Sequence, residues 1–201
     1  MTNLTQCKRC GGDITLTPRS TNKKFCGVEC YESWWSEERS QGLTNADRNE
    51  ILFGPVKVET LSPAQAAWLA ALIDGEGTIS IGRRKKVLNR SGFYYQVNVT
   101  IANTNFDLIS YTRTLVGPDN SAVYFHKRGP KHKDCYTLRI NVRAVPTLLR
   151  QLHSYLIIKK RQAEMAIKVC ELKEDSFWVT DNHEIYEHFY LEAKALNRRG
   201  R

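Results

Sequence analysis

Four cysteines within the first 30 residues have the spacing of a metal site. Cys7 and Cys10 form one close pair and Cys26 and Cys30 a second, in the pattern C-x2-C-x15-C-x3-C. Four thiolates on two separate turns supply the tetrahedral sulfur set that Zn²⁺ prefers. In a reducing compartment such clustering favours zinc over disulfides. The sequence predicts one structural zinc ion per chain, with reduced or disulfide-linked loops as the alternative.

A second candidate site lies in the stretch WLAALIDGEGTISI, residues 68–81. An apolar, helix-compatible run leads directly into Asp74, Gly75, Glu76 and Gly77, and a strand pattern follows at once. Carboxylates are disfavoured at a helix C-terminus, where the macrodipole is negative. This arrangement predicts a positive group that offsets the two acids, with a capped helix end and solvated acids as the alternative. The glycines suit a backbone that turns sharply and approaches its neighbours closely.

Two runs of positive charge point to an anionic partner. Lys and Arg outnumber Asp and Glu by 30 to 21, giving a net charge of +9. Residues 83–90, RRKKVLNR, carry five cations, and residues 126–133, HKRGPKHK, carry four together with two histidines. Both runs lie beside expected strands, so a hairpin could carry them into a groove. This favours nucleic acid over a membrane surface, with an inert basic surface as the alternative.

The elements that position these residues can be read from caps and periodicity. Ser62, Pro63 and Gln65 form a helix start, and the helix is expected to reach about Asp74. Residues 78–84 and 94–103 alternate as strands, followed by a helix over 106–116 and a second hairpin over 122–128 and 135–143. Helices over 144–155, 159–173 and 181–197 complete an α+β class fold. Cys135 and Cys170 fall in these elements and are expected to be core thiols.

The chain divides into three expected segments. Residues 1–42 form a metal-binding module whose helix, residues 31–41, carries Trp34 and Trp35 to cover a small core. Residues 43–61 contain Gly and Pro residues that favour turns and loops, and they are interpreted as a linker. Residues 62–201 form the main domain. The sequence has no run of 18 apolar residues and no apolar N-terminal segment, so we expect an intracellular protein in the cytoplasm or nucleoid, neither secreted nor in a membrane.

The motif and the element order resemble a known family. LAALIDGEG, residues 69–77, is similar to the signature of LAGLIDADG homing endonucleases of the single-motif type, and α-β-β-α-β-β-α is that family's order. YLIIKKRQAEM, residues 155–165, and IANTNFDLI, residues 101–109, are similar to its later segments. The resemblance covers about residues 62–173 and implies a saddle-shaped antiparallel sheet. The cysteine module resembles a treble-clef or zinc-ribbon finger.

Three positions depart from the family name. Ala71 stands where the family favours Gly at a helix-to-helix contact, which implies a slightly wider crossing. Gly75 replaces Ala, and Glu76 replaces Asp. Either carboxylate can hold a divalent metal, so the implied chemistry is retained.

The resemblance implies a metal-dependent active site. Two motif helices would pack side by side, with divalent metal ions between the acids and the scissile phosphates, and that metal would offset Asp74 and Glu76. Glu76 and the Gly75 carbonyl would bind Mg²⁺, in a site of the two-metal type. Lys159 would act near the metals and Asn103 would hold water, while Asp74 would cap or brace the helix ends. The alternatives are an exposed lysine and a strand-end cap.

The resemblance also predicts how duplex DNA is bound. A two-stranded ribbon fits the major groove, where polar side chains read base edges. The expected base readers are Ser80, Arg84, Gln96, Asn98, Thr100, Arg139 and Asn141. The expected phosphate contacts are Arg83, Lys85, Lys86, Lys127, Lys131 and Lys133. The finger would extend the footprint or only stabilise the fold.

The expected function is a site-specific DNA endonuclease that hydrolyses both strands of a near-palindromic target. One motif helix supplies one set of acids, so a homodimer is expected. Two alternatives use the same fold: an RNA-binding intron maturase and a non-catalytic DNA-binding regulator.

Overall fold

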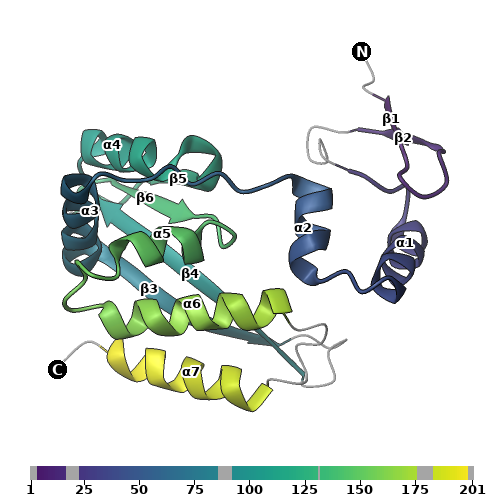
Figure 1. Ribbon diagram of the computed structural model, residues 1–201. Helices are drawn as coiled ribbons and strands as arrows, with labels where there is room; N and C mark the ends of the chain where they lie inside the picture. Colours follow the sequence, from purple (N-terminus) through teal and green to yellow (C-terminus); the bar gives the residue numbers. More distant parts are fainter. Residues whose placement is uncertain (1–3, 17–22, 86–91, 131, 176–182, 199–201) are drawn as a thin grey trace. The chain divides into compact units, whose positions relative to one another are not determined.

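The computed structural model describes residues 4–16, 23–85, 92–130, 132–175 and 183–198. The chain forms two compact units, residues 1–55 and 56–201, and each has its own hydrophobic core. Figure 1 shows the elements in chain order. No helix within the described ranges has both the length and the apolar character needed to cross a membrane.

The N-terminal unit is built around the cysteines. It contains, in order, β1 (Leu4–Gln6), β2 (Asp13–Thr15), α1 (Val28–Ser40) and α2 (Asn45–Phe53). Strands β1 and β2 pair antiparallel. Cys7, Ile14, Phe25 and Trp34 form its buried core, with Trp35 packed against them. Trp34 therefore covers the cysteine module, as the sequence predicted.

Helix α2 lies in the segment that was interpreted as a linker. Its N-cap is Thr44, whose side chain accepts a hydrogen bond from the Asp47 N–H while the Asp47 carboxylate accepts one from the Thr44 N–H. This reciprocal capping box starts a helix, and Gly54, with a φ of 75°, ends it. The helix-breaking residues between 43 and 54 thus mark the two ends of a helix. The two units divide after Pro55.

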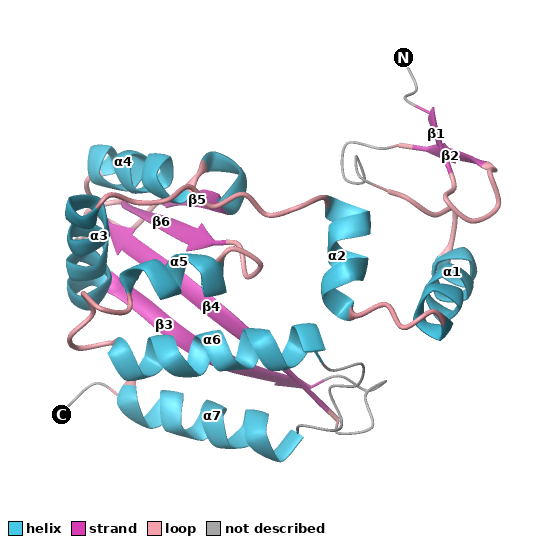
Figure 2. Cartoon of the chain, in the orientation of Figure 1, coloured by secondary structure: helices cyan, strands magenta, loops and turns pink. Residues whose placement is uncertain are grey.

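In the part of the chain that the structure describes, the C-terminal unit contains a four-stranded antiparallel sheet and five α-helices. The strands are β3 (Gly77–Lys85), β4 (Phe93–Asn103), β5 (Ser121–His126) and β6 (Cys135–Ile140). The helices are α3 (Pro63–Glu76), α4 (Phe106–Val116), α5 (Val145–Leu152), α6 (Lys160–Asp175) and α7 (His183–Leu196), with a 3-10 turn at Pro118–Asn120. The predicted α-β-β-α-β-β-α order is confirmed (Figure 2).

The sheet has one buried face and one polar face. Its strand order is β3-β4-β6-β5, and all neighbours are antiparallel. The buried face contributes Ile79, Ile81, Val97, Val99, Ile101, Leu138 and Ile140 to the same core as the helices. Cys135 and Cys170 are also buried, as predicted. Because strand side chains alternate, the intervening polar residues share the opposite face.

Helix α3 begins as the sequence predicted and ends later. Ser62 and Gln65 form a reciprocal capping box, and Pro63 occupies the first turn. The helix continues through Glu76 instead of stopping near Asp74. Strand β3 then starts at Gly77, where a Cβ would lie 2.8 Å from the Ile73 carbonyl oxygen. Only glycine fits this tight change from helix to strand, whereas at Gly75 a Cβ would meet nothing within 4 Å.

Candidate active site and nucleic-acid interface

The four N-terminal cysteines converge on one point. Their Sγ atoms all lie within 4.8 Å of one another, with 3.7 Å between Cys10 and Cys26 and 3.4 Å between Cys26 and Cys30. Four thiolates at about 2.3 Å from a tetrahedral zinc ion lie about 3.8 Å apart, so the cluster fits this metal. Cys30 lies in the first turn of α1. Backbone N–H groups, that of Cys10 above all, lower the pKa of the Cys7 thiol to about 6, whereas hydrogen bonding with the Cys26 thiol raises the pKa of Cys30 to about 12. The four cysteines could therefore hold a metal ion such as zinc.

Asp74 is held by the chain itself. One carboxylate oxygen accepts hydrogen bonds from the backbone N–H groups of Ile157 and Ile158, at 2.7 and 3.1 Å, and the other accepts one from Lys159, at 2.9 Å. Burial raises the pKa of Asp74, but these donors and the Lys159 charge outweigh it, so the pKa is lowered. Asp74 thus joins the end of α3 to the segment that starts α6, which is the bracing role considered for it.

Lys159 supplies the positive charge at the end of α3. Its Nζ donates a hydrogen bond to the Asp74 carbonyl oxygen, one of the last carbonyls of the helix. A cation is favoured there because the helix macrodipole is negative at its C-terminus. Lys159 and the three backbone donors therefore offset the negative charge of Asp74 at this helix end. The lysine is partly buried and engaged, so it is not simply an exposed residue at a helix start.

Substituting Asp74 should weaken the fold in a pH-dependent way. In Asp74→Asn one amide group replaces a charged acceptor of three N–H groups, so we expect the free energy of unfolding to fall by about 2 kcal/mol at pH 7. A lowered carboxyl pKa contributes stability above the unfolded value, near 4, and loses it as pH falls through the folded pKa. The difference between variant and wild type should shrink below about pH 4. Denaturant unfolding at several pH values measures it.

The matched control is Asp107→Asn, an exposed acid in the first turn of α4. It should change the free energy of unfolding by at most about 0.5 kcal/mol. Equal losses in the two variants would contradict the bracing role of Asp74.

Glu76 ends α3 in a different environment. Its side chain is exposed and has no hydrogen-bond or ion-pair partner among the described residues. It lines a hollow with Asn103 from the end of β4 and with Arg128, His132 and Lys133 from the β5–β6 connection. The Asn103 Oδ1 accepts a hydrogen bond from the Asn105 N–H at 2.9 Å, so this residue also caps the strand end. The hollow thus combines an unpaired carboxylate with basic side chains.

Most predicted base readers share the polar face of the sheet. The register pairs Ser80 with Asn98 and Thr100 with Arg139, and Arg84 follows Ser80 at the alternating spacing of β3. The polar face therefore carries Thr78, Ser80, Arg84, Gln96, Asn98, Thr100, Thr137 and Arg139. An Arg139 Nη2–Asn98 Oδ1 hydrogen bond of 3.0 Å crosses it. Asn141 follows β6 and lines one hollow with Gln96 and Arg139.

Arg83 lies on the other face. It follows Ile79 and Ile81 in the strand alternation, and its guanidinium forms an ion pair of 2.5 Å with Glu187 of α7. It also lies 4.7 Å from the Phe93 ring centre and 4.8 Å from that of Tyr190. These contacts, with a partner 104 residues away, differ from the phosphate contact predicted for Arg83.

The other predicted phosphate contacts lie in or beside the two hairpins. Lys85 is the exposed last residue of β3, and Lys127 and Lys133 are exposed in the β5–β6 connection. Lys86 and Lys131 fall outside the residues that the structure describes.

Solved structures provide the decisive comparison. No protein-family model and no curated protein matches the sequence. The archaeal intron-encoded homing endonuclease I-Vdi141I, solved with DNA, aligns at a TM-score of 0.58 and 14% identity over 69% of this chain and 87% of that one. The homing endonuclease I-CvuI, also solved with a DNA target, aligns at 0.54 and 16% over 69% and 85%.

A third similar structure is that of a LAGLIDADG homing endonuclease. The LAGLIDADG homing endonuclease I-SmaMI, bound to cleaved DNA, aligns at a TM-score of 0.51 and 19% identity, over 73% of this chain and 47% of that one. The chain has the LAGLIDADG homing endonuclease fold. The identities are too low to carry more than the fold, and the motif resemblance in residues 69–77 agrees with it.

Two residues that line the candidate site were not predicted from the sequence. Arg128 and His132 line the Glu76 hollow, although only their neighbours at 127, 131 and 133 were singled out. The cation-rich run of residues 126–133 was the available sequence signal. The run alone does not show which of its side chains turn toward the end of α3. The Arg128 N–H donates to the Asp134 carboxylate at 2.8 Å, which helps to shape this connection.

Proposed function

We propose that the chain is a metal-dependent DNA endonuclease that acts as a homodimer. The observation that carries the proposal is the position of Glu76. It is an exposed carboxylate without a partner among the described residues, at the point where α3 meets the sheet, beside Asn103 and three basic side chains. An acid that lies beside basic side chains but pairs with none of them is suited to bind a divalent metal, while the basic side chains bind a phosphate. Asp74, two residues earlier, is fully engaged and does not compete for this role.

The residues present fit a magnesium site. Mg²⁺ prefers oxygen ligands, and Glu76 offers a carboxylate while Gly75 offers a carbonyl in the last turn of a helix, where intrahelical donors are lacking. When bound, such a metal would acidify a water molecule and neutralise charge on the phosphate. We place Glu76 and Gly75 as its protein ligands.

The chain's own groups perform the remaining tasks. Lys159 is fixed at the end of α3 by its bond to the Asp74 carbonyl, so its ammonium can stabilise negative charge near that helix end. The Asn103 Oδ1 is engaged by Asn105, which leaves its Nδ2 to orient water or phosphate oxygen in the hollow. Arg128, His132 and Lys133 can hold the phosphate backbone beside Glu76.

The polar face is the proposed surface for duplex DNA. Strands β3 and β4 form a long two-stranded ribbon, the shape that enters a major groove. We assign base contacts to its polar residues and phosphate contacts to Lys85, Lys127 and Lys133. Arg83 is left out because Glu187 holds it on the helix-covered face.

A second copy of the chain would cover the free side of α3. Ala66 and Ala70 are buried in the chain's own core, whereas Ala67 and Ala71 are exposed and allow another backbone to approach closely. Three exposed apolar side chains belong to the same region: Trp68 of α3 is 37% exposed, and Ile157 and Ile158, whose N–H groups bind Asp74, are 86% and 69% exposed. Water-exposed isoleucines beside a helix of small residues favour an interface between copies.

The N-terminal unit contributes no net charge to DNA binding. Residues 1–55 contain seven Lys and Arg and seven Asp and Glu, so the whole charge of +9 belongs to residues 56–201. Lys8 and Arg9 are further engaged, donating to the Ile51 carbonyl and the Glu37 carboxylate. We therefore assign the finger first to stabilising its own fold, with DNA contact confined to individual side chains.

One zinc ion should bind per chain. Metal analysis of purified wild-type protein should find a single zinc, and a strong chelator should change Trp34 fluorescence because Trp34 packs in the core that contains Cys7. Cys26→Ser should lose the zinc, while Cys135→Ser, at a buried thiol outside the cluster, should keep it. Zinc-free protein with four freely titratable N-terminal thiols would contradict the assignment.

Two measurements test the proposed function against its alternatives. Supercoiled plasmids carrying randomised inserts, incubated with Mg²⁺, should be linearised at a subset of sites. A competition between duplex DNA and RNA of the same sequence should favour DNA. Preferential RNA binding without cleavage would favour a maturase, and DNA binding without cleavage would favour a regulator.

A further inference from the structure

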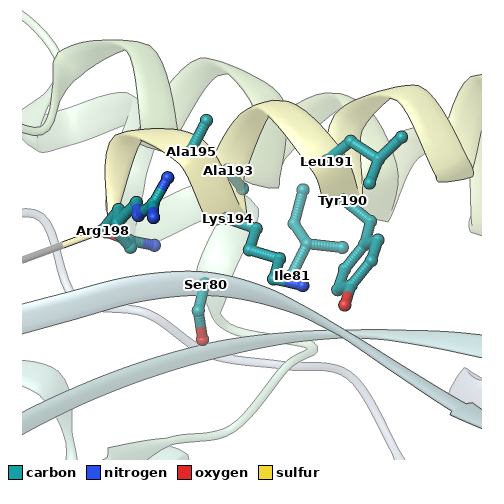
Figure 3. Close-up of a pocket in the computed structure, with 9 residues that line it drawn as sticks. Ser80, Ile81, Tyr190, Leu191, Ala193, Lys194, Ala195 and Arg198 are labelled. Atoms are coloured by element: carbon teal, nitrogen blue, oxygen red, sulfur yellow. The ribbon is translucent and has the colours of Figure 1, made fainter.

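A groove runs along the exposed edge of the sheet beside α7. Strand β3 is an edge strand, and the groove lies between it and the C-terminal half of α7 (Figure 3). Tyr190, Leu191 and Ile81 give it apolar walls, and Lys194 and Arg198 bring two cations, four residues apart. In Figure 3 Lys194 extends from α7 toward β3, and Ser80 points from the strand away from the helix.

Among the residues that the structure describes, the two cations have no anionic partner. Neither Lys194 nor Arg198 forms an ion pair with a carboxylate of the described residues. The nearby acids of α7 are already paired, Glu187 with Arg83 at 2.5 Å and Glu192 with Arg161 at 2.7 Å. No Asp or Glu lines the groove within the described part of the chain. The groove therefore carries a net positive charge, which suits an anionic ligand.

The groove is also fixed in position and continuous with the polar face. The Asn197 Nδ2 donates a hydrogen bond of 2.8 Å to the Ile79 carbonyl, which anchors the end of α7 to the edge of β3. That bond occupies an edge acceptor that an added peptide strand would need. Ser80 belongs both to the groove and to the polar face, where it pairs with Asn98.

We propose that this groove binds phosphates of the DNA backbone at the β3 edge of the proposed interface. The inference rests on the proposed function. Lys194 and Arg198 supply the charge, and Tyr190 and Leu191 pack against the adjoining deoxyribose. Such contacts position the duplex on the sheet and carry no sequence information. The two cations should therefore raise affinity for every duplex alike.

The test is the salt dependence of binding by the full chain. The probes are a mixed-sequence 30-base-pair duplex and a cleavage site selected by the wild type. Each phosphate contact contributes about 0.9 to the slope of log K against log salt. The double variant Lys194→Gln/Arg198→Gln should reduce the slope by about 1.8 on both duplexes. Between 50 and 200 mM salt, its affinity should therefore fall about 10-fold less than that of the wild type.

The matched control removes two cations from the helix-covered side. Arg150→Gln/Lys168→Gln has the same charge change, and both residues pair with Glu171 at exposed positions. The salt slope of this control variant should equal that of the wild type. The melting temperature of the groove variant should also equal that of the wild type. The base preferences of the groove variant should also be unchanged.

The outcomes separate this inference from the proposed function. If the wild type binds and cuts DNA but the two double variants have the same slope, the groove does not hold phosphate. A change in base preference at unchanged slope would also contradict the inference. If the wild type binds neither duplex, the proposed function itself fails.

Discussion

Glu76→Gln should abolish cleavage and leave DNA binding largely intact. The substitution keeps the size of the side chain but removes the charge that would hold a divalent metal. Since Glu76 has no partner in the described chain, the fold loses no contact. We expect the cleavage rate to fall at least about 10³-fold, which corresponds to about 4 kcal/mol of transition-state stabilisation. Affinity for the target duplex should change less than about threefold, because phosphate contacts dominate affinity.

Two measurements check this result. Single-turnover cleavage of a labelled target gives the rate, and a gel-shift titration in Ca²⁺ gives the affinity. Glu184→Gln, at an exposed acid in the first turn of α7, is the matched control and should cleave at the wild-type rate. A Glu76→Gln protein that cuts at nearly the wild-type rate would remove Glu76 from the active site.

Ala71→Arg should prevent dimer formation and, with it, double-strand cleavage. Ala71 lies on the exposed side of α3, so a long charged side chain can point into solvent in the monomer. In a dimer with α3 packed against α3, two such charges would meet at the centre of the interface without partners. We expect the variant to sediment as a single chain at concentrations where the wild type is a dimer. Double-strand cleavage should fall at least about 100-fold, equivalent to about 2.7 kcal/mol.

Sedimentation velocity on the protein alone and on its DNA complex measures the assembly. Ala46→Arg, at an exposed alanine of α2, introduces the same charge and should leave the dimer intact. Both variants should retain the wild-type circular dichroism spectrum. A stable one-chain complex that still makes double-strand breaks would contradict the dimer.

Local rules predicted much of the fold. The capping box at Ser62 and Gln65 placed the start of α3, and strand alternation assigned Ile79 and Ile81 to the core face. The same rules also apply at two further places. Thr44 and Asp47 form a capping box that predicts the start of α2. Strand alternation places Arg83 on the core face, together with Ile81, whereas Arg84 lies on the opposite face. These signals depend only on neighbours within a few residues.

Long-range pairing could not be predicted from the sequence. Asp74 is bound by backbone groups 83 to 85 residues later, and no spacing rule connects them. The acid was therefore grouped with Glu76 as part of one metal-dependent feature, although the structure separates a bracing residue from an unpaired one. The same limit applies to Arg83 and Glu187, and to the β5–β6 connection that turns Arg128 and His132 toward Glu76.

Cleavage-site selection from a randomised duplex library tests most directly whether the chain is a metal-dependent endonuclease. Wild-type protein and Glu76→Gln are incubated with Mg²⁺ or with EDTA, and both ends of every cut molecule are sequenced. Wild type with Mg²⁺ should enrich one near-palindromic site cut on both strands, and EDTA or the substitution should abolish this product. A folded wild-type protein that cuts no duplex, or a site cut equally by Glu76→Gln, would contradict it.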